Sequence, residues 1–220
     1  MAGSRSLSTD EEAAVLSALA LFSARDRLYI TLALNLGLRL RELTSLTVAQ
    51  IWDGARPRAF LRIERRQLKL GRSTTRRRSV FSRTLPLNTT ARTAIEEYFH
   101  EETISNRLVR PQELVFVSSS GRRAISRMQV SRILRRIFVA AGIDTSSRLG
   151  SHSLRKTFCG KIWEASGHNI EVTRASLRHR HISTTQAYLP CGDAEAHRLI
   201  LALDQPAAIP TTARSTYSLQ

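Results

Sequence analysis

Helical patterns lie on both sides of one strand-like stretch, residues 59–87, and this arrangement restricts the fold more than any other feature. Within the stretch, FLRIERR and SVFSRTLPL are typical of β-strands and flank the polar turn GRSTTRRR. Elsewhere apolar residues recur at helical spacing, and capping residues such as Ser8 and Gly37 mark helix ends. The pattern predicts helices over residues 8–21, 25–36, 40–46, 126–141, 152–165, 170–177 and 183–189, another that starts at 88, and a last one over 194–203. We therefore predict an α+β fold, mainly helical, with a small antiparallel β-sheet inserted early.

Basic residues outnumber acidic residues by 34 to 18, so the 220-residue chain has a net charge of +16. This excess predicts a polyanionic partner, and nucleic acid fits better than an anionic membrane because no basic amphipathic helix has a bulky apolar face. No apolar run reaches the roughly 18 residues of a membrane-spanning helix. Cys159 and Cys191 lack a metal-ligand pattern, and residues 1–13 lack the apolar segment of a secretory signal. We predict a cytoplasmic protein.

Two motifs in the C-terminal half contain residue types that act on phosphate groups. His152 and Arg155 in HSLR are three residues apart, so a helix brings both side chains to one face. The segment LRHRHISTTQAY, residues 177–188, combines two histidines, two arginines, a Thr-Thr helix start and Tyr188. Each motif alone also fits an ordinary solvated helix face. A metal site at His179 and His181 lacks a third ligand, and the flanking arginines oppose a cation.

Two further motifs lie in the N-terminal half. Arg39 and Glu42 in GLRLREL are three residues apart, which also fits a helix-surface ion pair worth about 0.3–0.5 kcal/mol. Lys69 precedes the arginine-rich turn and is one of only three lysines, with Lys156 and Lys161. A solvated hairpin lysine is the ordinary interpretation of Lys69.

Taken together and in this order, the four motifs resemble the catalytic domain of the tyrosine recombinases, the phage integrase family. The family pattern is an Arg in G-L-R-x-x-E-L, a Lys on a β-hairpin, then H-x-L-R, and finally L-G-H-x-x-(I/V)-x-T-T-x-x-Y. The resemblance covers residues 8–189, including connecting segments similar to LPLN and VFVSSSG. Two positions depart from the usual pattern: Arg178 replaces a Gly, and Lys156 stands where a second His or a Lys is common.

The resemblance implies a catalytic set of Arg39, Lys69, His152, Arg155, His179 and Tyr188. Tyr188 would attack the scissile phosphate and form a 3′-phosphotyrosyl link, so rejoining needs no metal, ATP or other cofactor. Arg39, Arg155 and His179 would stabilise charge on the non-bridging oxygens. Lys69 would protonate the leaving 5′-oxygen, and His152 would accept the tyrosine proton. Glu42 would support the site by orienting Arg39.

The other arginines are candidates for contacts with the DNA backbone. Near the hairpin they are Arg65, Arg66, Arg72, Arg76, Arg77 and Arg78, and around the next helix they are Arg122, Arg123, Arg127, Arg132, Arg135 and Arg136. Phosphate contacts set affinity and salt dependence and carry no sequence information. An ordinary solvated basic surface accounts equally well for about half of them.

The resemblance also implies a domain organisation and partners. Residues 1–190 would form the catalytic domain, and residues 191–220 a C-terminal helix and tail. The family's N-terminal DNA-clamping domain is expected to be absent, either in a shortened chain or in a single-domain form resembling the fimbrial phase-switch recombinases. The expected partners are double-stranded DNA with a specific recombination site, three further copies in a tetramer into which residues 194–203 pack, and an accessory DNA-bending protein. The protein would then associate with the nucleoid.

Two other functions fit the same residues. A type IB topoisomerase shares the tyrosine chemistry and would relax supercoils without site preference. A DNA-binding module that has lost catalysis is the second alternative, although loss of activity usually removes a catalytic side chain and the set is complete here. The sequence therefore predicts a site-specific DNA recombinase or integrase, and leaves open its target site and the direction of the reaction.

Overall fold

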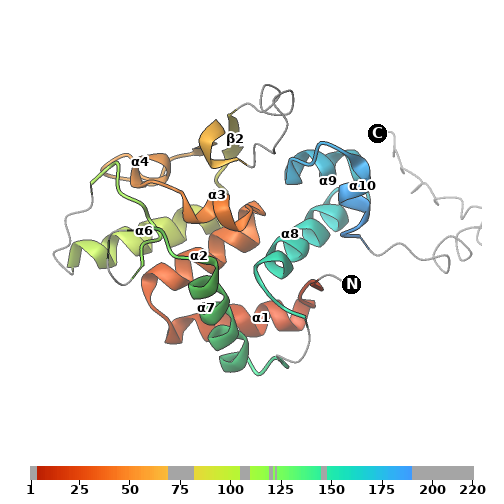
Figure 1. Cartoon of the computed structure of the whole chain (residues 1–220), viewed down its shortest axis with the longest axis horizontal. Coiled ribbons are helices and arrows are strands. Elements are labelled where there is room, and N and C mark those ends of the chain that lie inside the picture. The colour runs from red at the N-terminus through yellow and green to blue at the C-terminus, as the bar shows by residue number, and fades with distance from the viewer. Residues whose placement is uncertain are drawn as a thin grey trace, which may run out of the picture.

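The computed structural model describes residues 4–68, 82–104, 110–118, 121, 123–144 and 148–189. Over these residues the chain is mainly helical with one small antiparallel sheet (Figure 1), so the predicted fold class is confirmed. The elements are α1 Thr9–Ala18, the 3₁₀ helix η1 Leu19–Leu21, α2 Ala24–Leu36, α3 Leu40–Thr44, α4 Val48–Ile51, β1 Phe60–Ile63, the 3₁₀ helix η2 Arg65–Gln67, β2 Arg83–Pro86, α6 Thr89–Ile104, α7 Arg127–Ala140, α8 Ser151–Ala165, α9 Ile170–Leu177 and α10 Ile182–Gln186. No helix in these ranges is long and apolar enough to cross a membrane.

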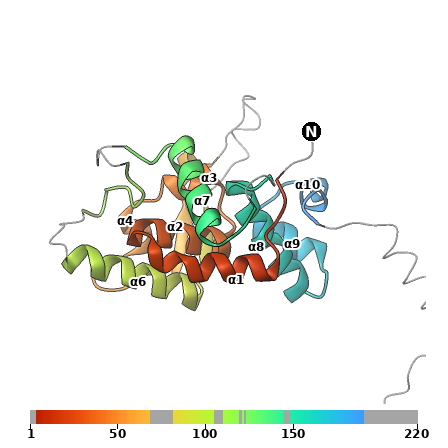
Figure 2. The same cartoon turned by 90° about the horizontal axis from the view of Figure 1, so that it is seen from below.

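The main hydrophobic core is built around α2, whose side chains are buried along most of its length. A helix that is apolar nearly all round has to be covered on several sides. Two of its neighbours are α6 and α8, and Figure 2 shows α6 and α7 on opposite sides of α2. The face of α6 predicted from the sequence, with Ala91, Ile95 and Phe99, is the face that is buried. The central position of α2 brings its C-terminal end close to α8.

A second, smaller hydrophobic cluster joins α8, α9 and the chain after α10. Phe158, Cys159 and Leu177 are buried in it, and Tyr188 and Leu189 pack against them. Figure 1 shows the three helices gathered together at one side of the molecule. The cluster therefore holds the C-terminal tyrosine beside α8.

The strands β1 and β2 pair antiparallel, with Phe60 opposite Pro86 and Ile63 opposite Arg83. The strand predicted over FLRIERR is too long, because β1 ends at Ile63 and η2 follows. The cause is the buried side chain of Gln67, whose Oε1 accepts from the Glu64 backbone N–H (2.7 Å) while its Nε2 donates to the Ser45 carbonyl (2.7 Å). These bonds turn the chain inward before residue 69.

Two helices also end earlier than the sequence predicts. The helix predicted over residues 40–46 ends at Thr44, and the helix predicted over 183–189 ends at Gln186. After α10 the chain forms a turn in which the Tyr188 N–H donates to the Thr185 carbonyl (2.8 Å). Tyr188 therefore lies in a turn and not on a helix. The polar turn GRSTTRRR and the helix predicted over 194–203 lie outside the described residues.

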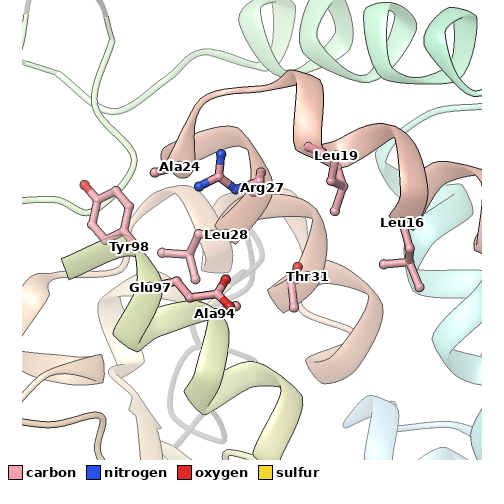
Figure 3. Close-up of a pocket in the computed structure, with 10 residues that line it drawn as sticks. Leu16, Leu19, Ala24, Arg27, Leu28, Thr31, Ala94, Glu97 and Tyr98 are labelled. Atoms are coloured by element: carbon pink, nitrogen blue, oxygen red, sulfur yellow. The ribbon is translucent and has the colours of Figure 1, made fainter. Parts of the chain in front are cut away.

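A pocket lies between α1, η1, α2 and α6 (Figure 3). It is lined by Leu16, Leu19, Ala20, Ala24, Arg27, Leu28, Thr31, Ala94, Glu97 and Tyr98. None of the candidate catalytic residues that the structure describes lines it. The candidate site lies instead where α2, α3, α8 and α9 meet.

Candidate active site

The turn between α2 and α3 holds the first arginine of the candidate site. Gly37 ends α2 in the left-handed conformation (φ 54°), and a Cβ there would overlap the ring of Phe158. Arg39 is the N-cap of α3, and the Glu42 carboxylate accepts hydrogen bonds from the Arg39 backbone N–H (2.8 Å) and from its Nη1 (3.0 Å). The Glu42 side chain is 1% exposed, whereas that of Arg39 is 36% exposed. Glu42 therefore anchors Arg39 from the interior and leaves part of this side chain accessible.

The second arginine, Arg155 on α8, is buried and bonded to the backbone of two other helix ends. Its guanidinium donates to the Gly37 carbonyl and to the Leu177 carbonyl (2.6 Å), and its Nη2 lies 3.0 Å from Nε2 of His179. Burial lowers the pKa of Arg155 to about 10, and the nearby Arg39 adds to this effect, while Glu42 opposes it. The side chain is therefore charged at neutral pH. Its Nε is buried and has no hydrogen-bond partner among the described residues.

His179 has a contact at each ring nitrogen. Nε2 faces Arg155, and Nδ1 lies 3.0 Å from Oγ1 of the buried Thr185. A guanidinium only donates, so Nε2 must accept and the ring proton must sit on Nδ1, directed at Thr185. Burial lowers the pKa of His179 to about 3, and the positive charges of Arg155 and Arg39 add to the shift. The imidazole is therefore neutral in this arrangement.

Tyr188 lies next to the pair formed by Arg155 and His179. Its ring meets the His179 ring edge to face, with 5.2 Å between centroids and 85° between planes. On α8, Nζ of Lys156 lies 5.5 Å from the centroid of the Tyr188 ring, within the range of a cation–π contact. The sequence identifies Lys156 only as a departure from the family pattern, because its contact with Tyr188 depends on how the chain after α10 packs against α8. Tyr188 thus has a lysine over its ring and a histidine at its side.

His152 stands at the first turn of α8 and is exposed. Although part of the residue surface is exposed, neighbouring atoms partly desolvate the ring and lower its pKa, and the charges of Arg155, Arg127, Arg39 and Lys156 lower it further. A neutral imidazole at neutral pH can accept a proton. Arg127 begins α7, and α7 packs against α8.

Arg178, which the sequence identifies only as a replacement of a family glycine, is the third arginine at this site and, like Arg155, is buried. It has a left-handed backbone (φ 58°), and its side chain is 5% exposed. Its Nη2 donates to the Gly37 carbonyl (3.1 Å) and lies 3.8 Å from Oε2 of Glu42. Burial lowers the pKa of Arg178 to about 10, and Glu42 opposes the shift. In the sequence, the only indication of this role is an arginine where the family usually has a glycine. The inward direction of the side chain could not be predicted, because it depends on the position of α2.

The structure thus brings together most of the residues singled out from the sequence. Arg39, Glu42, Arg155, His179 and Tyr188 form one group, with His152 at its edge. The other candidates, Lys69, Arg72, Arg76, Arg77, Arg78 and Arg122, lie outside the described residues. The remaining candidate arginines are exposed: Arg65 and Arg66 on η2, Arg123, and Arg127, Arg132, Arg135 and Arg136 on α7. Within the described part of the chain, no three His, Cys, Asp or Glu side chains group as metal ligands.

This fold is that of the catalytic domain of a tyrosine recombinase. The sequence model of the Phage integrase family matches residues 5–194, and the chain belongs to this family. The chain is similar to the tyrosine recombinase XerC of Pseudomonas fluorescens, with 30% identity over 164 residues, which are 74% of this chain and 47% of that protein. It therefore spans about half the length of this relative.

Two solved structures have the same fold. The crystal structure of the XerA recombinase aligns with a TM-score of 0.66 and 19% identity over 94% of this chain and 65% of that chain. A XerH site-specific recombinase bound to its difH substrate, a pre-cleavage complex, aligns with a TM-score of 0.62 and 20% identity. That alignment covers 89% of this chain and 53% of the other chain. At these identities the likeness establishes the fold alone.

Proposed function

We propose that this chain is a site-specific DNA recombinase that cleaves and rejoins DNA strands through a 3′-phosphotyrosyl intermediate. The observation that carries the proposal is the line of contacts from Arg155 through His179 to Tyr188, with Arg39 held nearby by Glu42. Membership of the Phage integrase family and the similarity to XerC support the same activity. The XerH complex with difH supports double-stranded DNA with a specific site as the substrate.

The proposed reaction exchanges one phosphate ester for another. The hydroxyl oxygen of Tyr188 attacks the phosphorus of a DNA phosphodiester, and a P–O bond to the tyrosine forms while the P–O bond to the 5′-oxygen breaks. The products are a 3′-phosphotyrosyl link and a free 5′-hydroxyl. Attack of a 5′-hydroxyl on the phosphotyrosine reverses the step and joins strands. Because the number of ester bonds is unchanged, the cycle needs no ATP, and the arginines supply the positive charge that a metal ion or other cofactor would otherwise provide.

Arg39 and Arg155 supply positive charge where the non-bridging oxygens gain negative charge. Part of the Arg39 side chain is accessible, and Nη2 of Arg155 contacts the Leu177 carbonyl and Nε2 of His179. A phosphate oxygen would compete with His179 for Nη2 of Arg155. Once the oxygen takes this donor, the His179 proton can move to Nε2 and bond the phosphate, because the hydroxyl of Thr185 can accept from or donate to Nδ1. The buried threonine therefore supports both tautomers of His179.

Two protons have to move during cleavage. We assign the tyrosine proton to His152, whose lowered pKa keeps the imidazole neutral and able to accept it. We assign protonation of the leaving 5′-oxygen to Lys69. This second assignment rests on the family resemblance, since Lys69 lies outside the described residues.

The proposal extends to assembly on DNA. Residues 1–190 would act as the catalytic domain, and the segment AEAHRLILAL, residues 194–203, would pack into a neighbouring subunit of a tetramer on paired sites. The apolar content of this segment supports the role, although it lies outside the described residues. The exposed arginines of η2 and α7 would contact the DNA backbone. An accessory DNA-bending protein would be a further partner on the DNA, and the protein would associate with the nucleoid.

A covalent-trapping assay tests the proposed function. The protein is incubated with nicked suicide duplexes taken from the DNA around its own gene, and an adduct that survives SDS is measured. We expect an adduct with the wild-type chain and with Tyr217→Phe, which lies beyond the residues matched by the family, and none with Tyr188→Phe. If no duplex gives an adduct while salt-sensitive DNA binding persists, the chain is a DNA-binding module and the proposal is wrong. Relaxation of supercoiled DNA without site preference would identify a topoisomerase instead.

A further inference from the structure

We infer that Arg178 is a positioning residue of this site, because its buried guanidinium joins the C-terminal end of α2 and the carboxylate of Glu42 to the segment that carries His179. The inference rests on the proposed function for the chemistry that Arg178 supports. The contacts themselves are independent of that function. Arg178 would act through Glu42 on Arg39 and through the backbone on His179, without touching the DNA.

The backbone of Arg178 indicates that its side chain has a specific task. Among the described non-glycine residues, only His168 and Arg178 have a positive φ. A side chain in the left-handed region has a steric cost that glycine avoids. His168 is exposed, whereas the Arg178 side chain is buried against α2. The contacts of a buried guanidinium offset the cost at Arg178.

The contacts of Arg178 converge on groups that carry negative charge. It donates to the Gly37 carbonyl (3.1 Å) and the Leu36 carbonyl (3.4 Å), which stand at the negative end of the α2 dipole. Its Nη2 is 3.8 Å from Oε2 of Glu42, the oxygen that accepts from the Arg39 N–H. Burial of a carboxylate is costly unless cations or hydrogen-bond donors contact it. Arg178 and Arg39 therefore hold Glu42 between them.

The same residue is linked directly to the histidine of the site. The N–H of Arg178 donates to the Ala175 carbonyl (3.0 Å), and the N–H of His179 donates to the Arg174 carbonyl (3.1 Å), which closes the end of α9. Arg155 shares the Gly37 carbonyl with Arg178 and also bonds to the Leu177 carbonyl. A shift of Arg178 would therefore move His179 relative to Arg155.

Arg178→Gly is the decisive variant, because glycine accepts the left-handed backbone and the change removes only the side chain. His168→Gly is the matched control, since it makes the same replacement at the other positive φ, where the side chain bonds to Glu164 on the exposed surface. Arg178→Lys keeps the charge and loses the planar fork. Thermal unfolding of all three variants checks that each one is folded before the site is tested.

The first measurement is the hydrogen exchange of the Arg39 amide in the DNA-free protein. If Arg178 holds Glu42, this amide exchanges about tenfold faster in Arg178→Gly and at the wild-type rate in His168→Gly. Glu42→Gln should accelerate it as well, and adding Arg178→Gly to Glu42→Gln should give little further change. Unchanged exchange of the Arg39 amide in Arg178→Gly would overturn the inference, whether or not the chain cleaves DNA.

The second measurement separates DNA binding from cleavage. We expect Arg178→Gly to bind the duplex with the wild-type Kd and to form the covalent adduct about 10- to 100-fold more slowly, because a displaced catalytic group costs rate. Millimolar guanidinium should restore part of the rate, whereas the same concentration of sodium chloride should not. A wild-type rate in Arg178→Gly overturns the inference, and so does a lowered rate that guanidinium does not restore. Absence of an adduct from the wild-type chain counts against the proposed function alone.

Discussion

The glycine that ends α2 has two separate reasons to be glycine. Its φ of 54° disfavours any side chain, and a Cβ would overlap the ring of Phe158. Gly37→Ala is expected to lower the free energy of unfolding by about 2 kcal/mol or more, through backbone strain and overpacking together. Gly142 has a φ of 69° with nothing within 4 Å of the added Cβ, so Gly142→Ala carries the strain alone. Urea unfolding of both variants measures the difference, and equal losses would contradict the overlap.

His179 makes the stability of the protein depend on pH. Its pKa is about 3 when folded against 6.5 as the ordinary value, so the unfolded chain binds the proton first as the pH falls. The contribution of His179 to the free energy of unfolding is fully present above pH 6.5 and is lost progressively as the pH falls from 6.5 toward 3. Between pH 7 and pH 5, the free energy of unfolding of the wild-type chain should therefore fall by up to about 2 kcal/mol more than that of His179→Gln.

Denaturant unfolding at the two pH values tests this prediction. His100→Gln, on the exposed face of α6, is the control for removing one histidine. The wild-type chain and His100→Gln should lose stability in parallel toward pH 5. If His179→Gln falls as steeply as they do, the buried histidine is not the group that titrates.

At the scale of elements, local sequence patterns were sufficient to predict where a helix lies when capping residues mark its ends. The predicted helix over residues 170–177 is α9, and the helix that stops at Gly37 is α2. The sequence could not show that β1 ends at Ile63, because the bond from Gln67 to the Ser45 carbonyl reaches across the fold. It named the six catalytic candidates by resemblance but not the inward direction of Arg178, which depends on where the end of α2 lies.

The short helix α10 places one threonine of its Thr-Thr pair inside and the other outside. Thr185 is buried with its Oγ1 at 3.0 Å from Nδ1 of His179, and Thr184 is exposed. Thr185→Val should lower the free energy of unfolding by about 1–3 kcal/mol, because the Nδ1–H of His179 loses its acceptor. It should also slow adduct formation, since the histidine tautomers are no longer both supported. Thr184→Val, measured by the same unfolding and trapping assays, should match the wild type, and equal effects at both positions would contradict this role for α10.

Across the whole molecule, the candidate site joins segments that are far apart in the chain. The guanidinium of Arg155 reaches the carbonyl of Gly37, 118 residues earlier, and Arg178 reaches the same atom. Several buried or partly buried cations therefore surround one small region of a chain whose net charge is +16. Such a concentration of positive charge is stabilised when an anion binds, so DNA should raise the melting temperature of the protein.

The exposed arginines of α7 should control how strongly DNA binding depends on salt. Arg132 and Arg135 are exposed on this helix, whose first turn lies near His152. If each contacts one phosphate, Arg132→Ala and Arg135→Ala should each reduce the slope of log K against log salt by about 1, because one fewer counterion is released. Arg92→Ala removes the same charge from α6, on the other side of α2 (Figure 2), and should leave the slope unchanged. Fluorescence anisotropy over a salt series measures all three slopes, and equal reductions in all of them would mean that net charge, and not the face of α7, determines binding.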